Sequence, residues 1–398
     1  MKTMNEIILT PKENLITPES ITRRCTVTRL KDNQVTEESE LWFELPNSIT
    51  PSESLDCDSY VCAMLMDAMA ESASLTIKGS VSRSLLSNLC EYQGAWNKWL
   101  PDIFSLIEIK AEQIRDDSNT KVEGAVCAFS GGVDACFTVW RHYFKKCSHQ
   151  AKEIQFCILI HGYDIPLSNQ EAFDESYRTA KQTLDSLNLD LKIIKSNFRE
   201  ISKAKWKYTH AAAFIAAFSQ AKEMTNECLF ASSEPYDALI YPWGTNPITD
   251  HLLGSNNFKV FHDGAAFSRS EKVACLPKWP EALKNLRVCW ESTDAVLNCG
   301  KCEKCLRTMI NFLANGLPVP DSMSNSSELI KNMRKIRLKS RPAINEWQTC
   351  LAHAQKNNIK GKWLKTVKNL IFWSKFRNAF TAKRRRFKYF LKSIYLWK

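Results

Sequence analysis

The pattern of apolar and polar positions predicts a small α+β domain over residues 1–118. Its apolar positions form short strand-like runs separated by amphipathic, helix-like segments. The polar stretch EQIRDDSNTKVEG (112–124), which overlaps the end of this domain, predicts a linker to the next part of the chain. The expected strands are RRCTVTRL (23–30), ELWFELP (40–46) and SLTIKGSV (74–81), and the expected helices are SYVCAMLMDAMAES (59–72) and SRSLLSNLCEYQGAWNKWLP (82–101).

From residue 119 to 330 the pattern changes to continuous apolar runs that alternate with amphipathic segments. Strands that are apolar on both faces and are spaced by helices are typical of a parallel sheet covered on both sides. We therefore expect an α/β fold with a doubly wound parallel sheet, whose ligands bind at the carboxyl ends of the strands. The runs are GAVCAFS (124–130), IQFCILIHGYD (154–164), LKIIKSNF (191–198) and NECLFASS (226–233).

The formal net charge of +11 over 398 residues is unevenly distributed. Residues 331–398 hold 20 lysines and arginines against one acid, Glu346, and so carry +19, which leaves the first 330 residues with −8. The basic character belongs to the C-terminal segment, where we expect a third part of the chain, a basic helical tail.

The cysteines and the N-terminal segment indicate a reducing, cytoplasmic compartment. The 15 cysteines are scattered, which favours core thiols or metal ligands over disulfides. The first residues include acids and lack the apolar centre of a signal peptide, and no run of about 18 apolar residues predicts a membrane span. The length of the chain does not require a dimer, and a homo-oligomer stays one of the alternatives.

The stretch Ser130, Gly131, Gly132, Val133 and Asp134 follows the first apolar run of the α/β region and precedes a helical segment. Unpaired backbone N–H groups and the dipole of a helix N-terminus attract anions there. Adjacent glycines let the backbone approach phosphate oxygens closely. We expect these residues to bind the phosphates of a nucleotide, with Asp134 orienting the loop or holding Mg²⁺; an ordinary tight turn is the alternative.

This stretch resembles the signature S-G-G-x-D-S of the PP-loop ATP pyrophosphatase superfamily. Ala135 stands in the place of the last serine of the signature, which removes one hydroxyl donor to phosphate. The loop matches neither the Walker A pattern nor the G-x-G-x-x-G dinucleotide pattern.

A second motif is formed by Cys289, Cys299, Cys302 and Cys305, with the spacing C-x9-C-x2-C-x2-C. Four thiolates at such spacing can surround Zn²⁺ as a tetrahedron, and Gly300 allows the chain to turn between ligands. A closed four-thiolate site of this kind would be structural. An iron–sulfur cluster and a chance group of buried thiols are the alternatives.

Together the loop and the cysteines resemble the 7-cyano-7-deazaguanine synthase branch of the PP-loop superfamily, over about residues 120–315. The resemblance implies a C–N bond-forming ligase that converts a deazapurine carboxylate to a nitrile with ATP and ammonia, as in queuosine biosynthesis. Adenylation of the carboxylate would release pyrophosphate. It also implies ATP, Mg²⁺ and Zn²⁺ as cofactors.

Polar residues that follow the later strands are further candidates for ATP binding. Asp164 follows the second apolar run, Asn197 the third and Ser232 the fourth. A ligand site at a sheet edge needs polar groups at successive strand ends, whereas each residue alone would be an ordinary loop residue.

Four residues between 243 and 272 are candidates for the substrate and the reaction. Trp243 is expected to stack on a planar base, with a buried structural tryptophan as the alternative. Asp263 and Arg269 are expected to bind the substrate. Lys272 resembles the PP-loop lysine that stabilises charge on the leaving pyrophosphate, and a solvent-exposed lysine is its alternative.

The tail shows a basic amphipathic pattern at helical spacing. It fits an anionic membrane surface, which would make the protein peripheral at a membrane, or a nucleic acid; docking on the acidic first 330 residues is the third alternative. The apolar face would hold Phe387, Phe390, Leu391, Ile394 and Trp397, and the charges around it Arg384, Arg385, Lys388 and Lys392.

Two other functions stay open beside the synthase-like one. A related enzyme could adenylate another substrate, such as a tRNA base or a different carboxylate. Alternatively, Ala135 could mark a nucleotide-binding sensor or scaffold with weakened catalysis. Release of pyrophosphate would separate the enzymes from the sensor.

Overall fold

The computed structural model describes residues 5–117, 122–289 and 298–395, with the side chains of the last helix described up to residue 381. The chain forms two compact units, Met1–Ala266 and Phe267–Lys398. The strands are β1 (Asn5–Ile16), β2 (Ser20–Lys31), β3 (Gln34–Pro46), β4 (Ala73–Ser82), β5 (Ile109–Arg115), β6 (Ala125–Ala128), β7 (Ile154–His161), β8 (Leu191–Ser196), β9 (Glu227–Ala231) and β10 (Lys259–Asp263). The helices are α1 (Asp58–Glu71), α2 (Arg83–Trp99), α3 (Val133–Tyr143), α4 (Gln170–Asp185), α5 (Phe198–Ile201), α6 (Trp206–Phe218), α7 (Arg269–Cys275), α8 (Pro280–Lys284), α9 (Glu303–Ala314), α10 (Leu329–Met333), α11 (Arg341–Lys356) and α12 (Trp363–Tyr395).

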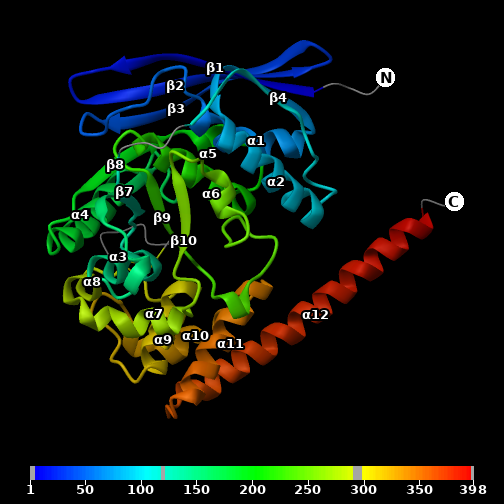
Figure 1. Cartoon of the computed structure of the whole chain (residues 1–398). Coiled ribbons are helices and arrows are strands. Elements are labelled where there is room, and N and C mark those ends of the chain that lie inside the picture. The colour runs from blue at the N-terminus through cyan, green and yellow to red at the C-terminus, as the bar shows by residue number, and fades with distance from the viewer. Residues whose placement is uncertain (1–4, 118–121, 290–297, 396–398) are drawn as a thin grey trace. The chain divides into compact units, whose positions relative to one another are not determined.

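The first unit is built on one ten-stranded sheet with the strand order β10-β9-β6-β7-β8-β3-β2-β1-β4-β5 (Figure 1). Within the run β10-β9-β6-β7-β8, each strand is parallel to the next one. The prediction of an α/β fold with a large, mostly parallel sheet is therefore confirmed.

Helices cover both faces of the parallel strands. Because successive side chains of a strand point to opposite faces, neighbouring residues of β7 identify the two layers. Ile160 packs into the core that contains Ala212 of α6, whereas the ring of His161 stacks on Phe173 of α4 with their centroids 4.1 Å apart. This covering explains why the parallel strands are apolar on both sides.

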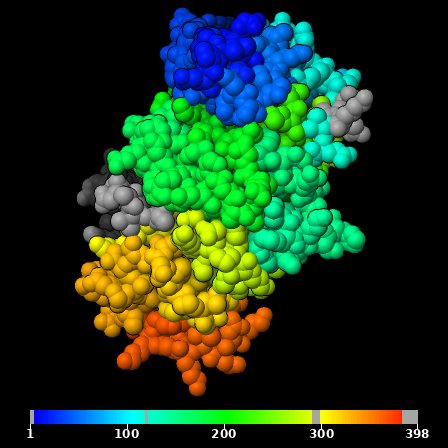
Figure 2. Space-filling model, turned by 90° about the vertical axis from the view of Figure 1, so that its left-hand side faces the viewer, coloured from blue at the N-terminus to red at the C-terminus, as the bar shows by residue number. Residues whose placement is uncertain are grey.

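The N-terminal strands extend this sheet. Strand β3 pairs antiparallel with β8, with Phe43 opposite Ser196 and Glu44 opposite Lys195. Helix α1, which is buried along nearly its whole length, packs against α6. In Figure 2 the blue residues of β1–β3 border the green residues of the same unit without a break.

The compact units do not coincide with the domains predicted from the sequence. Strands from residues 1–118 and from 119–330 share one sheet, and the units divide after Ala266. Compactness alone does not decide whether a segment folds independently. The domains 1–118, 119–330 and 331–398 therefore stay predictions.

Three strands differ from the sequence-based expectation. Residues 112–115 of the expected linker belong to β5, which pairs parallel with β4. Strand β1 was not expected because lysine, glutamate and proline interrupt its apolar positions. Strand β10 was not expected either, because its sequence KVFHD holds three charged or polar residues and only two apolar ones.

The second unit is helical in its described residues. Helix α9 packs against α7, α10 and α11. The indole Nε1 of Trp347 on α11 donates to Glu303 Oε1 of α9 at 2.6 Å. Arg307 of α9 forms ion pairs with Glu303, at 2.9 Å, and with Glu346 of α11. The single acid of residues 331–398 therefore lies in an ion pair.

Candidate functional site

The loop between β6 and α3 contains the predicted phosphate-binding residues. Ser130 is exposed and Gly131 has a φ of +73°, a conformation that favours glycine. Gly132 is the N-cap of α3, and its carbonyl accepts from Cys136 N at 2.9 Å. Asp134 lies half-buried in the first helical turn, beside the buried Val133. The backbone thus turns sharply at Gly131 and delivers the next N–H groups to a helix N-terminus, where anions bind favourably.

The strand order gives this loop its setting. Connections from β6 lead to β7 and β8 on one side, whereas β9 and β10 lie on its other side. In such sheets the ligand crevice lies outside the carboxyl ends, where the strand order changes direction. That position falls between β6 and β9.

Four predicted ATP-binding residues, Ser130, Asp164, Asn197 and Ser232, follow adjacent parallel strands and therefore lie at one edge of the sheet. Ser130 follows β6 and the exposed Asp164 follows β7. Ser232, which follows β9, is fully buried, and its hydroxyl donates to the carbonyl of Glu234 at 2.6 Å. The structure thus brings these strand ends to one edge of the sheet, and the binding of ATP there stays a prediction.

Asn197, which follows β8, uses its side chain within the fold. Its Oδ1 accepts from Trp42 N at 3.0 Å, and its Nδ2 donates to the carbonyl of Glu40 at 2.8 Å. Both partners lie on β3, so Asn197 joins the parallel strands to the N-terminal ones. Its role in ATP binding stays a prediction.

Asp263 at the end of β10 anchors α3. Its carboxylate accepts from Thr138 Oγ1 at 2.7 Å and pairs with His142 Nε2 at 3.0 Å and with the Arg141 guanidinium at 3.3 Å. Burial alone would raise the pKa of Asp263, but the hydrogen bond and charge of His142 and the charge of Arg141 lower it below its usual value. The carboxylate fixes the helix that follows the glycine loop, and its predicted contact with substrate stays a prediction.

Replacing Asp263 with asparagine should lower the free energy of unfolding by about 3 kcal/mol at pH 7, because it removes one charge from a buried pair. A carboxyl whose pKa is depressed in the folded state stabilises above its unfolded pKa, and this contribution is lost as pH falls through the folded pKa. The difference between the variant and the unaltered protein should therefore shrink below pH of about 4. Urea unfolding at pH 7 and at lower pH measures it. Asp102→Asn, at an exposed position, is the matched control; an equal loss at every pH would contradict the assignment.

Trp243 lies half-buried with its ring 5.5 Å from that of His210, at 62°. Its carbonyl accepts from Asn246 Nδ2 at 3.0 Å. The loop that holds Trp243 is therefore ordered by its own hydrogen bonds. Its contact with a base stays a prediction.

The pair formed by Asp250 and His262 was not predicted from the sequence. Asp250 is fully buried and accepts from Thr245 Oγ1 at 2.6 Å, while its Oδ2 lies 2.7 Å from His262 Nδ1. This pair ties the Trp243 loop to β10. The residues are twelve positions apart and match no local motif, so only the structure reveals the contact.

Arg269 and Lys272 lie on α7 in the second unit. Both are buried, Lys272 with 1% of its surface exposed. The alternative of a solvent-exposed lysine therefore does not hold for Lys272. Ser268 begins α7 with a capping box, in which its hydroxyl accepts from Glu271 N and Glu271 accepts from Ser268 N. Because the loop belongs to the other unit, the roles of Arg269 and Lys272 stay predictions.

The four motif cysteines gather in the second unit. The Sγ atoms of Cys289, Cys299, Cys302 and Cys305 all lie within 4.8 Å of one another. The pairs Cys289–Cys302 and Cys299–Cys305 are separated by 3.8 and 4.0 Å. A tetrahedral zinc ion with bonds of about 2.3 Å needs sulfur atoms about 3.8 Å apart. The cluster can therefore hold a metal ion such as zinc.

Backbone groups shape the cluster around its sulfur atoms. The N–H groups of Lys301 and Cys302 donate to Cys299 Sγ at 3.4 and 3.3 Å. Gly300 has a φ of +67°, and a Cβ there would lie 1.8 Å from the carbonyl oxygen of Ser324. This turn thus requires glycine and brings Cys299 close to Cys302.

Asn298, which the sequence motif does not include, positions Cys289, the first cysteine of the cluster. It is fully buried, and its Oδ1 accepts from Val288 N and Cys289 N at 2.8 and 3.2 Å. Its Nδ2 donates to the carbonyls of Leu286 and Ser322 at 2.8 Å each. One amide therefore holds both segments of the cluster together.

The crowded sulfur atoms favour protonated thiols unless a cation is present. The hydrogen bond with the Cys289 sulfur, together with burial, raises the pKa of Cys302 to about 12. A metal cation would supply the positive charge that stabilises the thiolates.

Comparisons with protein-family models, curated proteins and solved structures found no match to this chain.

Proposed function

We propose that this protein is an ATP-using enzyme of the PP-loop type, similar to the 7-cyano-7-deazaguanine synthases. It would adenylate a carboxylate on a deazapurine-like substrate and release pyrophosphate. One observation carries the proposal: the S-G-G-V-D loop follows the middle strand β6, where the order of the parallel strands changes direction. Phosphate groups bind well at such a loop.

Different groups of the loop would bind the phosphates and the Mg²⁺ ion of ATP. Backbone N–H groups from Gly131 to Asp134 and the exposed hydroxyl of Ser130 would donate to phosphate oxygens. The Asp134 carboxylate suits Mg²⁺, a hard cation that prefers oxygen ligands. Lys272 would stabilise the charge of the leaving pyrophosphate.

The proposed reaction consists of two adenylations. The substrate carboxylate attacks the α-phosphorus of ATP, the bond between the α-phosphorus and the bridging oxygen breaks, and pyrophosphate leaves. Ammonia then attacks the acyl carbon, and AMP leaves with the former carboxylate oxygen, giving an amide. A second ATP adenylates the amide oxygen, which releases a second pyrophosphate and one nitrogen proton, and loss of AMP and of the remaining nitrogen proton gives the nitrile.

We propose a structural role for the cysteine cluster with zinc as its metal. Four thiolates fill a tetrahedral shell and leave no open position for a substrate. The expected sulfur separations agree with those of the cluster.

A second candidate function is a nucleotide-binding sensor or scaffold. It is favoured by Ala135, which stands where the signature has serine and is buried in the first turn of α3. A tRNA base or a different carboxylate as the acceptor would leave the ATP chemistry unchanged.

The full chain with ATP, Mg²⁺, ammonia and 7-carboxy-7-deazaguanine should form AMP and pyrophosphate in equal amounts, and a reaction without the carboxylate is the control. Separation of nucleotides and a pyrophosphate assay measure the two products.

Lys272→Ala should lower the turnover number about a hundredfold, since an electrostatic contact to the charge that develops on the leaving pyrophosphate contributes about 3 kcal/mol. The same two assays measure the turnover of this variant. Binding of ATP without release of pyrophosphate, for this or other acceptors, would favour the sensor. Absence of ATP binding, or release of the γ-phosphate, would refute the proposal.

A further inference from the structure

The last helix carries a row of exposed aromatic side chains. Phe372, Trp373, Phe376 and Phe380 are exposed over 62, 52, 58 and 65% of their surface. The ring of Trp373 contacts those of Phe372 and Phe376 edge-on, with centroids 5.3 and 6.0 Å away. Contiguous exposed apolar groups of this size mark interaction surfaces. We refer to these four side chains as the aromatic row.

The opposite face of α12 is already occupied within the second unit. It packs on α10 and α11, and Ser374 Oγ accepts from Leu338 N at 3.1 Å. At 100° per residue, Ser374 and the middle of the aromatic row point in nearly opposite directions. The fold of this unit therefore does not require the aromatic row. The buried residues of the packed face are Trp363, Val367, Leu370, Ile371 and Ser374.

A cationic hollow lies beside the aromatic row. It is formed between α10 and α12, has a volume of about 550 Å³, and includes Trp373 of the row in its lining. Its lining also includes Arg334, Lys362, Lys365 and Arg377, and among the described residues no acid lines it. Four cations without a lining acid favour an anionic ligand.

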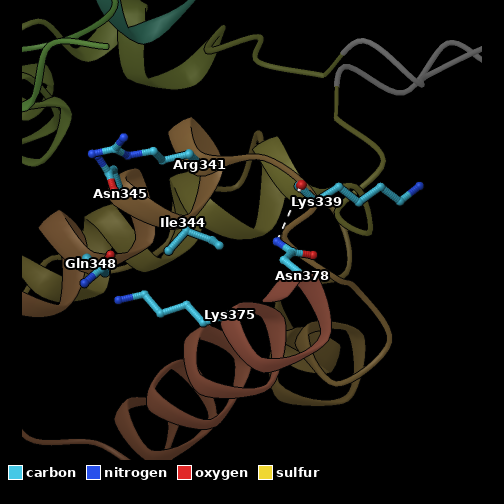
Figure 3. A pocket seen from close by; sticks show the side chains of 7 residues that line it. All are labelled: Lys339, Arg341, Ile344, Asn345, Gln348, Lys375 and Asn378. Carbon is cyan, nitrogen blue, oxygen red and sulfur yellow. Dashed lines mark hydrogen bonds between the residues drawn. The ribbon is translucent and has the colours of Figure 1, made fainter. Parts of the chain in front are cut away.

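A second hollow, of about 420 Å³, lies between α11 and α12 (Figure 3). Lys339, Arg341 and Lys375 line it together with amide side chains. Figure 3 shows the amide of Asn378 donating to the carbonyl of Lys339, 3.5 Å away. Both hollows beside α12 are therefore basic. The acid nearest in sequence to the first hollow, Glu328, is paired with Lys331, and the acid nearest to the second, Glu346, is paired with Arg307.

We propose that this surface docks on a bilayer that contains anionic phospholipids. The aromatic row would enter the region between headgroups and acyl chains, and the two basic hollows would bind lipid phosphates. An apolar stripe flanked by lysine and arginine is the pattern of helices that lie in a membrane interface. No helix among the described residues combines the length and apolar character needed to cross a bilayer.

The contacts within the row favour a bilayer over nucleic acid. Bases stack on the faces of separate aromatic rings, whereas Phe372, Trp373 and Phe376 pack edge against face on one another. Three of the four members are phenylalanines, which have no polar atom to contact a base edge. A second copy of the chain is disfavoured because both surfaces would be strongly basic.

The apolar residues beyond Thr381 belong to the same prediction. The predicted stripe Phe387, Phe390, Leu391, Ile394 and Trp397, with the cations Arg384, Arg385, Lys388 and Lys392, lies outside the described side chains.

Vesicle sedimentation of the full chain tests the proposal. Binding to vesicles of phosphatidylcholine with phosphatidylserine should be at least about tenfold tighter than to phosphatidylcholine alone, and molar salt should remove the difference. Equal, weak binding to both compositions at low salt would overturn the proposal. Tighter binding to RNA than to the anionic vesicles would overturn it in favour of a nucleic-acid surface.

Two sets of variants distinguish insertion of the aromatic row into the bilayer from electrostatic attraction of the basic residues to anionic lipids. The double variant Phe376→Ser and Phe380→Ser should weaken binding to anionic vesicles about tenfold or more while leaving thermal unfolding unchanged, because both side chains are exposed. Val35→Ser, which replaces an exposed apolar residue of the first unit, is the control. Lys365→Gln with Arg377→Gln should reduce only the preference for anionic lipid. If the serine variant binds like the unaltered protein, attraction is electrostatic alone and insertion of the row is refuted.

Discussion

Replacing Gly131 with valine is expected to weaken ATP binding about a hundredfold or more. Gly131 has a φ of +73°, and a β-branched residue in that conformation costs about 1–3 kcal/mol. The strained loop would also move its N–H groups away from the phosphates. Gly132→Val should weaken ATP binding through a different cause, since Gly132 has an ordinary φ of −81° and only the added bulk would block the phosphate. Titration calorimetry with ATP and Mg²⁺ measures both effects.

Gly94→Ala is a matched glycine control. Gly94 lies within α2, and an added Cβ there would meet no atom within 4 Å. This variant should bind ATP normally and be slightly more stable, because alanine is the better helix former. If Gly131→Val is folded and binds ATP with unchanged affinity, the loop is a structural turn and the ATP site lies elsewhere.

Much of the fold was predictable because parallel strands leave a local pattern. The apolar runs that became β6, β7, β8 and β9 were recognised since helices cover both of their faces. Pairing between strands distant in sequence leaves no such pattern, so the contact of β3 with β8 could not be predicted. That one antiparallel contact makes the N-terminal strands part of the large sheet.

The residues of the candidate sites also fall into two groups, those that belong to a local sequence motif and those that depend on contacts between distant residues. The glycine loop and Cys299, Cys302 and Cys305 are local motifs, because their chemistry needs residues at fixed short spacing. Asn298 was not predicted, since its role depends on carbonyls at Leu286 and Ser322. The two carbonyls stand 36 positions apart along the chain, and no motif joins them.

The purified protein is expected to contain about one zinc ion per chain, bound by four thiolates at about 2.3 Å. Cys302→Ser should remove the metal and lower the unfolding temperature of the second unit by about 10 °C or more, because the free energy of metal binding becomes free energy of folding. Cys302 is also the N-cap of α9, where its sulfur accepts from Cys305 N at 3.5 Å. Loss of the metal should therefore loosen the start of the helix against which α7, α10 and α11 pack. Elemental analysis and calorimetry measure the two effects.

Cys275→Ser provides the control within the same unit. Cys275 ends α7, is half-buried and lies outside the group of four clustered sulfurs, so this variant should retain the zinc and unfold at nearly the unaltered temperature. A strong chelator should destabilise the unaltered protein and the Cys275→Ser variant equally, but leave Cys302→Ser unaffected. If the purified protein contains iron and shows a visible charge-transfer band, the four cysteines hold an iron–sulfur cluster and the zinc assignment is wrong. Protein without any metal, with an unfolding temperature that Cys302→Ser does not change, would contradict the zinc proposal, because the large stabilisation expected from these four sulfurs comes from a bound cation.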